Sequence, residues 1–198
     1  MRIRIPQQKR SRERKSKIME TALDLFSQKG MNGTSSNEIV EKAGVSIGTF
    51  YSYFENKKAL FLEILKEHLQ NFITGIYTLQ TDDSIPIRDN IRSHIRKTFT
   101  VFDIHPSFHK EALVLKFSDP DVRRLFHEVE LKQIGIISAL LSPYCRRHDP
   151  ADLDEVSKVI HGAVENVAHS VKFLESPLDR ERLIEELTEM IFHYVNNL

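Results

Sequence analysis

The stretch "SSNEIVEKAGVSIGTFYSYF", residues 35–54, contains two short helical patterns separated by a glycine turn. Ser35 and Glu38 have the S-x-x-E spacing of a capping box, which predicts that a helix begins there. Gly44 breaks that helix, and Ser46 is placed to cap a second one. A helix of about eight residues, a short turn containing glycine and a second short helix have the spacing of a helix-turn-helix. The stretch therefore predicts a DNA-binding motif.

Four aromatic residues follow the turn within a few positions of one another. Phe50 and Phe54 lie four residues apart, and we expect both to face the core of the domain. Tyr51 and Tyr53 interleave with them, so the four rings cannot all face inward. Phosphate contacts position a helix on DNA, whereas base contacts specify the sequence. We therefore expect the hydroxyl groups of Tyr51 and Tyr53 to reach phosphates on either side of the recognition helix.

The first turn of that helix is made of small residues. A recognition helix enters the major groove with its first turn, so small side chains there allow close approach to the bases. Ser46, Ile47, Gly48 and Thr49 meet that need. Ile47 can touch a thymine methyl group, and Thr49 can offer a hydroxyl and a methyl group. Because the helix has no arginine for bidentate reading of guanine, we expect a half-site rich in thymine or in A·T pairs.

Basic residues concentrate in the first third of the chain, although the formal net charge is zero. Residues 1–58 hold 12 Lys/Arg and 6 Asp/Glu, whereas residues 59–198 hold 16 and 22. A basic N-terminal third suits a polyanion such as DNA, and a solubilising charged arm is the alternative. Lys57 and Lys58 begin a helix, where cations oppose the helix dipole unless a phosphate lies nearby. The basic arm consists of Arg2, Arg4, Lys9, Arg10, Arg12 and Arg14.

The remainder of the chain reads as helical, with prolines at positions that favour helix starts, such as Asp119-Pro120, Asp149-Pro150 and Ser176-Pro177. This pattern predicts an all-α protein of about nine helices. No apolar run approaches the ~20 residues that a membrane span needs, and one cysteine excludes an internal disulfide. We therefore expect a cytoplasmic protein without a membrane partner. No catalytic motif is recognisable, which predicts that the chain is not an enzyme and needs no cofactor.

The last two predicted helices carry apolar stripes at helical spacing. The first stripe is Val156, Ile160, Ala163, Val167, Val171 and Leu174, and the second is Leu183, Leu187, Met190, Ile191, Tyr194 and Leu198. Either both stripes pack on their own domain, or the two helices associate with those of a second copy.

Three weaker groups of residues each have a functional and a structural interpretation. His161, Glu165 and His169 recur every four residues, which suits a divalent metal, but a solvated polar helix face is the favoured interpretation. His105 and His109 lie beside Phe102 and Phe108, a combination that suits a small-molecule site, although surface histidines near a loop are the alternative. Cys145 lies in a polar loop and is either a redox sensor or, as we favour, an incidental thiol.

The stretch "ALDLFSQKGMNGTSSNEIVEKAGVSIGTFYSYFENKKALF" resembles the N-terminal DNA-binding domain of the tetracycline-repressor (TetR) family. The resemblance implies a three-helix DNA-binding domain over residues 1–58 and a larger helical ligand-binding and dimerisation domain over 59–198. Many relatives have a lysine or arginine where this chain has Ile47. The residues that match DNA-contacting positions are Ser35, Ser36, Asn37, Ser46, Ile47, Gly48, Thr49, Tyr51, Ser52, Tyr53, Lys57 and Lys58.

The resemblance also implies how the protein works. We expect a dimeric repressor that binds a near-palindromic double-stranded DNA operator and is released by a small-molecule inducer. The middle helices would line the ligand pocket, and Phe102, His105, Phe108 and His109 are the candidates. The last two helices would dimerise through Val156, Ile160, Ala163, Val167, Val171, Leu183, Leu187, Met190, Ile191 and Tyr194. The alternative is an architectural or partner-binding protein that associates with DNA and has no small-molecule ligand.

Overall fold

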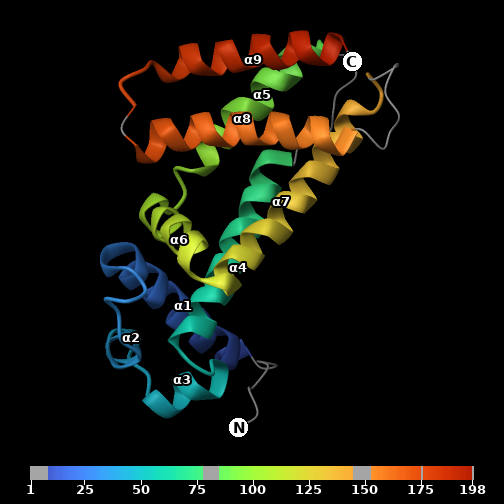
Figure 1. The fold of residues 1–198 in the computed structure, drawn as a ribbon. Coiled ribbons are helices and arrows are strands. Elements are labelled where there is room, and N and C mark those ends of the chain that lie inside the picture. The colour runs from blue at the N-terminus through green and yellow to red at the C-terminus, as the bar shows by residue number, and fades with distance from the viewer. Residues whose placement is uncertain (1–8, 78–84, 145–152, 175, 198) are drawn as a thin grey trace. The chain divides into compact units, whose positions relative to one another are not determined.

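The structure is a computed structural model that describes residues 9–77, 85–144, 153–174 and 176–197 of the 198-residue chain. These described residues form nine α-helices and no strand, which confirms the predicted all-α class (Figure 1). No helix among them is long and apolar enough to span a bilayer. The helices are α1 (Lys9–Lys29), α2 (Ser36–Ala43), α3 (Ile47–Tyr53), α4 (Lys57–Tyr77), α5 (Ile87–Val101), α6 (Pro106–Ser118), α7 (Pro120–Leu141), α8 (Leu153–Phe173) and α9 (Arg180–Asn196).

The described residues fall into two compact units. The first contains residues up to 68 together with 105–125, and the second contains 69–104 together with the residues from 126 onward. The chain therefore enters the second unit along α4, returns to the first for α6 and leaves again along α7. These structural units do not test the predicted functional domains, a DNA-binding domain over residues 1–58 and a ligand-binding and dimerisation domain over 59–198, which stay a prediction.

Side-chain caps fix the ends of the short helices in the first unit. The Glu38 backbone N–H donates to Ser35 Oγ at 3.1 Å, which confirms the predicted cap of α2. The Glu38 carboxylate accepts from Lys29 Nζ and from the Ser35 backbone N–H, and both hydrogen bonds lower the pKa of Glu38, so the reciprocal half of the expected capping box is present as well. Gly44 then ends α2 with φ of 64°, a left-handed conformation that a Cβ atom disfavours. Asn56 caps α4 through the Ala59 N–H at 2.9 Å.

Aromatic side chains fill the core of the first unit. Phe26 of α1 and Phe61 of α4 meet edge to face, with ring centroids 5.3 Å apart, and Phe61 also contacts Phe108 of α6 at 5.2 Å. Phe50 and Phe54 are fully buried, as their four-residue spacing predicted. Each buried ring removes apolar area from water, and rings from α1, α3, α4 and α6 together form the core of this unit.

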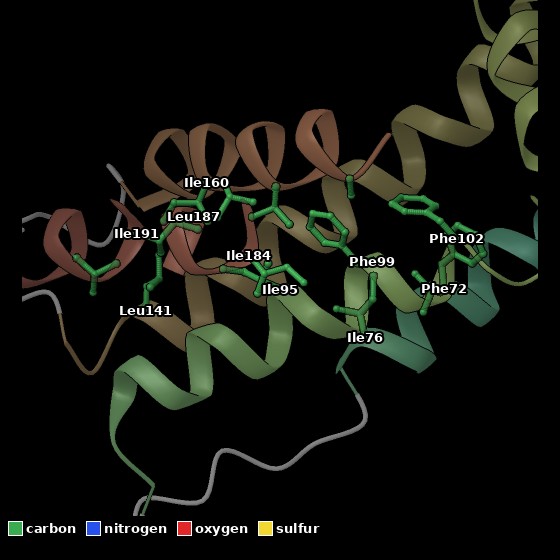
Figure 2. Packing of buried hydrophobic residues seen from close by; sticks show 14 of the residues in the cluster. Phe72, Ile76, Ile95, Phe99, Phe102, Leu141, Ile160, Ile184, Leu187 and Ile191 are labelled. Atoms are coloured by element: carbon green, nitrogen blue, oxygen red, sulfur yellow. The ribbon is translucent and has the colours of Figure 1, made fainter. Parts of the chain in front are cut away.

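The second unit is built on α5, α8 and α9. Figure 2 shows Ile95 and Phe99 of α5 packed with Ile184 of α9 in one apolar cluster. The helix α9 begins at Arg180 because Asp179 caps it, accepting from the Arg182 N–H at 2.8 Å. The prediction that Ser176-Pro177 begins this helix was wrong, and Asp149-Pro150 lies outside the described residues.

Four of the ten residues expected at a dimer interface belong to this core instead. Val156, Ile160, Leu187 and Ile191 are at most 8% exposed within one subunit, so the expectation that they face a second copy was wrong for them. A buried side chain has no surface left to offer a partner. Ala163, Val167, Val171 and Leu183 are half-buried, whereas Met190 and Tyr194 are exposed. The last residue of the second stripe, Leu198, lies outside the described residues.

Candidate nucleic-acid interface

The outward face of α3 is small, mostly polar and accessible. Ser46, Ile47 and Gly48 are exposed, and a Cβ added at Gly48 would meet only the Ser46 hydroxyl, at 3.9 Å. The Thr49 N–H donates to Ser46 Oγ at 3.1 Å, and the two hydroxyls lie 2.9 Å apart. Thr49 and Ser52 are half-buried at the side of this face. The first turn of α3 therefore presents small side chains together with one exposed isoleucine, Ile47.

The two tyrosines of α3 occupy different environments. Tyr51 is 38% exposed, as expected for a residue that reaches outward. Tyr53 is only 5% exposed, and its hydroxyl lies 2.8 Å from Oγ of buried Ser11 on α1. The expectation that Tyr53 points toward DNA was wrong, because its hydroxyl is satisfied inside the unit. Residues two positions apart on a helix are separated by about 200°, so Tyr51 and Tyr53 lie on nearly opposite faces of α3 and cannot both point outward.

The contact between Tyr53 and Ser11 fixes the basic start of α1 beside α3. Arg10, Arg12 and Arg14 flank Ser11 and are exposed, and none forms an ion pair with another described residue. A serine within a run of arginines gave no sequence signal for this role. The three guanidinium groups add positive potential around the start of α1, the helix to which Tyr53 anchors α3.

The start of α2 exposes two of its three candidate residues. Ser35 and Asn37 are exposed and Ser36 is half-buried. The Ser35 hydroxyl already accepts the Glu38 N–H as the helix cap. The remaining backbone N–H groups of a helix N-terminus suit an anion such as a phosphate.

The two lysines at the start of α4 have partners within the chain. Lys58 Nζ lies 2.7 Å from carboxylate oxygens of both Asp119 and Asp121, and these hydrogen bonds raise the pKa of Lys58. Lys57 Nζ donates to the backbone carbonyl of Thr34 at 2.5 Å. We expected a DNA phosphate to offset the unfavourable interaction of these lysines with the helix dipole. That expectation was wrong, because oxygen atoms of the chain itself already do so. Their contact with DNA stays a prediction.

Three of the four candidate pocket residues, His105, Phe108 and His109, have ring centroids 6.3, 5.4 and 5.4 Å from that of His68 in the first unit, and the fourth, Phe102, belongs to the second unit. Phe102 is buried in the second unit, where its ring centroid lies 4.6 Å from that of His169. Phe108 and His109 are buried in the first unit, with His109 Nδ1 3.3 Å from His68 Nε2. His105 is exposed at the start of α6. Phe102, Phe108 and His109 are buried within their own units, and the role of the four residues in a ligand pocket stays a prediction.

The polar residues of α8 are less solvated than their spacing suggested. His161 is 7% exposed, and its Nε2 lies 3.0 Å from Oε1 of Gln133 on α7. The favoured interpretation of a solvated face was therefore wrong for His161. In the part of the chain that the structure describes, no group of three or more His, Cys, Asp or Glu side chains is arranged to hold a metal ion. Cys145 lies outside that part.

The sequence matches two descriptions of known protein families. Residues 18–64, which contain α2 and α3, match the bacterial regulatory proteins of the tetR family. Residues 86–194 match the tetracyclin repressor-like C-terminal domain. Together the two matches cover the helix-turn-helix and most of the helices of the second unit.

Individual relatives are similar over different lengths. The uncharacterized HTH-type transcriptional regulator YuxN of Bacillus subtilis is 30% identical over 146 residues, which cover 70% of this chain and 48% of that protein. RutR of Escherichia coli, an HTH-type transcriptional regulator, is 35% identical over 101 residues, 50% of this chain and 47% of its own length. The chain thus spans about half the length of these curated relatives. The fatty acid metabolism regulator protein of Bacillus subtilis is 20% identical over 196 residues, 96% of this chain and 99% of that protein.

Solved structures share the fold. A putative TetR-family transcriptional regulator from Mesorhizobium loti superposes with a TM-score of 0.76 and 19% identity, over 94% of this chain and 98% of that one. The fatty acid degradation regulator FadR from Bacillus halodurans gives 0.67 and 18%, over 89% and 93%. At these identities, the likeness establishes the arrangement of helices.

Proposed function

Because the chain belongs to the TetR family of bacterial transcriptional regulators, we propose that it is a cytoplasmic, ligand-responsive repressor that binds a near-palindromic operator as a dimer. The family consists of DNA-binding regulators and not of enzymes. The observation that carries the proposal is the outward face of α3, where Ser46, Ile47 and Gly48 are exposed, on a helix that Tyr53 ties to the basic start of α1. Small residues enter the major groove, and the arginines of α1 attract the phosphates.

The apolar side chains left exposed on α8 and α9 support a dimer. Val159 of α8 is 61% exposed, and Met190 and Tyr194 of α9 are 51% and 41% exposed, on two helices that pack against each other. Gly162 of α8 has open space where a side chain would be, so a neighbouring helix could approach closely there. We propose that these residues, in place of the four buried ones, form the dimer interface. A two-fold pair would present two copies of α3 to half-sites one helical turn apart, ~34–36 Å.

Release by a small molecule follows from linkage. An inducer lowers operator affinity only if it binds the DNA-incompetent conformation more tightly than the DNA-bound one. One relative that aligns over nearly the whole chain is named a fatty acid metabolism regulator protein, so we would test fatty acids first as inducers.

Selection of bound DNA from genomic fragments, followed by footprinting, tests the proposal. We expect a discrete, near-palindromic site with two protected tracts and marked A·T content. Deleting residues 1–9 should weaken binding and flatten its dependence on salt, because phosphate contacts release counterions. Diffuse coating without a preferred site would overturn the repressor and favour the architectural alternative.

A further inference from the structure

A groove on the second unit runs between α4 and α7. It is an open trough with a volume of about 580 Å³. The lining residues from α7 recur every three or four positions, so they lie on a single face of that helix. The residues that carry the argument below are Gln70, Ile73, Lys132, Gly135, Ile136 and Leu140.

The lining is apolar along its length and cationic at one end. Ile73 is 8% exposed, and Ile136 and Leu140 are half-buried, so these side chains present an apolar wall. Among the described residues that line the groove, Lys132 is the one with a charge, and it forms no ion pair with another described residue. Gln70 offers an amide. An apolar trough with a lone ammonium group matches a molecule that has an apolar tail and a single anionic head.

Gly135 supplies an independent observation. It lies in the interior of α7, where glycine is less favourable than alanine by about 1 kcal/mol. A Cβ atom added at this position would meet nothing within 4 Å, so packing within the chain does not require its absence. Glycine at this position therefore destabilises α7 without relieving any contact, and its missing side chain leaves the groove wider.

We propose that this groove binds an amphiphilic monocarboxylate, and, building on the function proposed above, that such a molecule is the inducer. The carboxylate would pair with Lys132, with Gln70 as a second donor, and the acyl chain would lie over Gly135 toward Leu140. Eight residues of helix separate Lys132 from Leu140, a length of about 12 Å. A medium-length saturated chain fits that distance better than a short acid does.

Three probes of equal chain length separate the head-group requirement from the apolar one. The full-length protein is titrated calorimetrically with decanoate, decanol and decylamine. We expect decanoate to bind at least tenfold more tightly than decanol, and decylamine to bind most weakly, because a charge-assisted hydrogen bond to Lys132 favours the anion alone. Equal binding of decanoate and decanol would overturn the proposal and indicate a different occupant for the apolar surface, such as a protein helix.

Two variants locate the binding. Lys132→Gln should reduce decanoate affinity about tenfold and leave decanol unchanged, whereas the matched control Lys110→Gln, on α6 of the first unit, should change neither. Gly135→Ala should raise the melting temperature, since alanine favours helix, and yet weaken decanoate binding. Stability and affinity then change in opposite directions, which a purely structural glycine would not produce. Unaltered decanoate affinity in Gly135→Ala and in Lys132→Gln would overturn the site.

Operator binding is measured in the same variants. We expect decanoate to release the operator from the wild type and from Lys110→Gln, and to require about tenfold more ligand for Lys132→Gln. Intact operator binding without any decanoate effect would overturn the inducer while leaving the DNA-binding proposal in place. Absence of a discrete operator would overturn the proposed function independently of the groove.

Discussion

The outward faces of α3 and of the α8–α9 pair differ in chemistry. The α3 face offers small and polar groups, with Ser46 and Gly48 at its start and the Tyr51 hydroxyl further along. The α8–α9 face offers larger apolar side chains, of which Val159 and Met190 are more than half exposed. A hydrated polyanion suits the first face, and a second copy of an apolar surface suits the second. The contrast teaches that the chemistry of exposed residues, more than the presence of a helix, indicates the partner.

The two faces are also supported differently. The α3 helix has seven residues and depends on a cap at Ser46, buried Phe50 and the hydroxyl of Tyr53. The α8 and α9 helices have 21 and 17 residues and share a broad apolar core (Figure 2). Single contacts should therefore matter more to the DNA-binding face than to the dimer face.

The largest effect should come from placing charge on the apolar face. Val159→Asp combined with Met190→Asp would bury unpaired carboxylates in the proposed interface, at a cost of several kcal/mol. We expect monomers in sedimentation equilibrium and operator affinity reduced by 100-fold or more, roughly 3 kcal/mol. Leu131→Asp, also at an exposed apolar residue of the second unit, is the control and should stay dimeric. If the double variant remained dimeric, the apolar α8–α9 face would not be the dimer interface.

Acid should weaken the first unit through His68. Burial, with a smaller contribution from the charge of His105, lowers the pKa of His68 to about 4 from its ordinary 6.5. The unfolded chain therefore binds a proton that the folded one does not, so stability is full above about pH 6.5 and falls as the pH drops toward 4. We expect a loss of about 3 kcal/mol over that window in urea unfolding. His68→Gln should flatten the dependence, whereas exposed His127→Gln should leave it unaltered.

Two glycines separate backbone strain from surface access. Gly44→Ala places a Cβ atom on a left-handed residue and should destabilise the protein by about 1–2 kcal/mol in thermal unfolding. Gly48→Ala, within helical α3 and beside open space, should keep or slightly raise stability and yet weaken operator binding. If the loss of operator affinity in each variant only followed its loss of stability, Gly48 would not approach DNA.

The two tyrosines give the smallest and sharpest contrast. Tyr53→Phe removes a buried hydrogen bond to Ser11 and should cost about 1 kcal/mol of stability. Tyr51→Phe should leave stability unchanged and weaken binding to all DNA sequences alike, since a phosphate contact carries no sequence information. Replacing Ile47 or Thr49 should change the preferred sequence instead. A changed sequence preference in Tyr51→Phe would contradict the role given to its hydroxyl.

Local rules explain why much of the first unit was predictable from sequence. Ser35, Gly44 and Ser46 act on neighbours within a few residues, so their spacing alone located the helix ends. The partner of Tyr53, by contrast, lies 42 residues away and depends on how α1 packs. Propensity and spacing carry no information about that contact.

The second unit shows the limit of periodicity. The apolar stripes on α8 and α9 correctly indicated amphipathic helices. Periodicity alone does not show whether a stripe packs against its own chain or against a second copy. Ile160 and Ile191 are covered by the same chain, whereas Val159 and Met190 flank them and remain exposed. The groove beside Gly135 escaped prediction for the same reason, since it arises between helices distant in sequence.

Hydroxyl-radical labelling with and without operator tests the central claim most directly, because tyrosine and methionine side chains report their own exposure. Tyr51 is 38% exposed and Met190 51%, and Tyr53, at 5%, is an internal control. We predict that operator strongly protects Tyr51, leaves Met190 as it was in the free dimer and leaves Tyr53 unreactive throughout. Met190 should gain reactivity only when the dimer is diluted to monomers. Tyr51 labelled as rapidly in the operator complex as in the free protein would contradict the account.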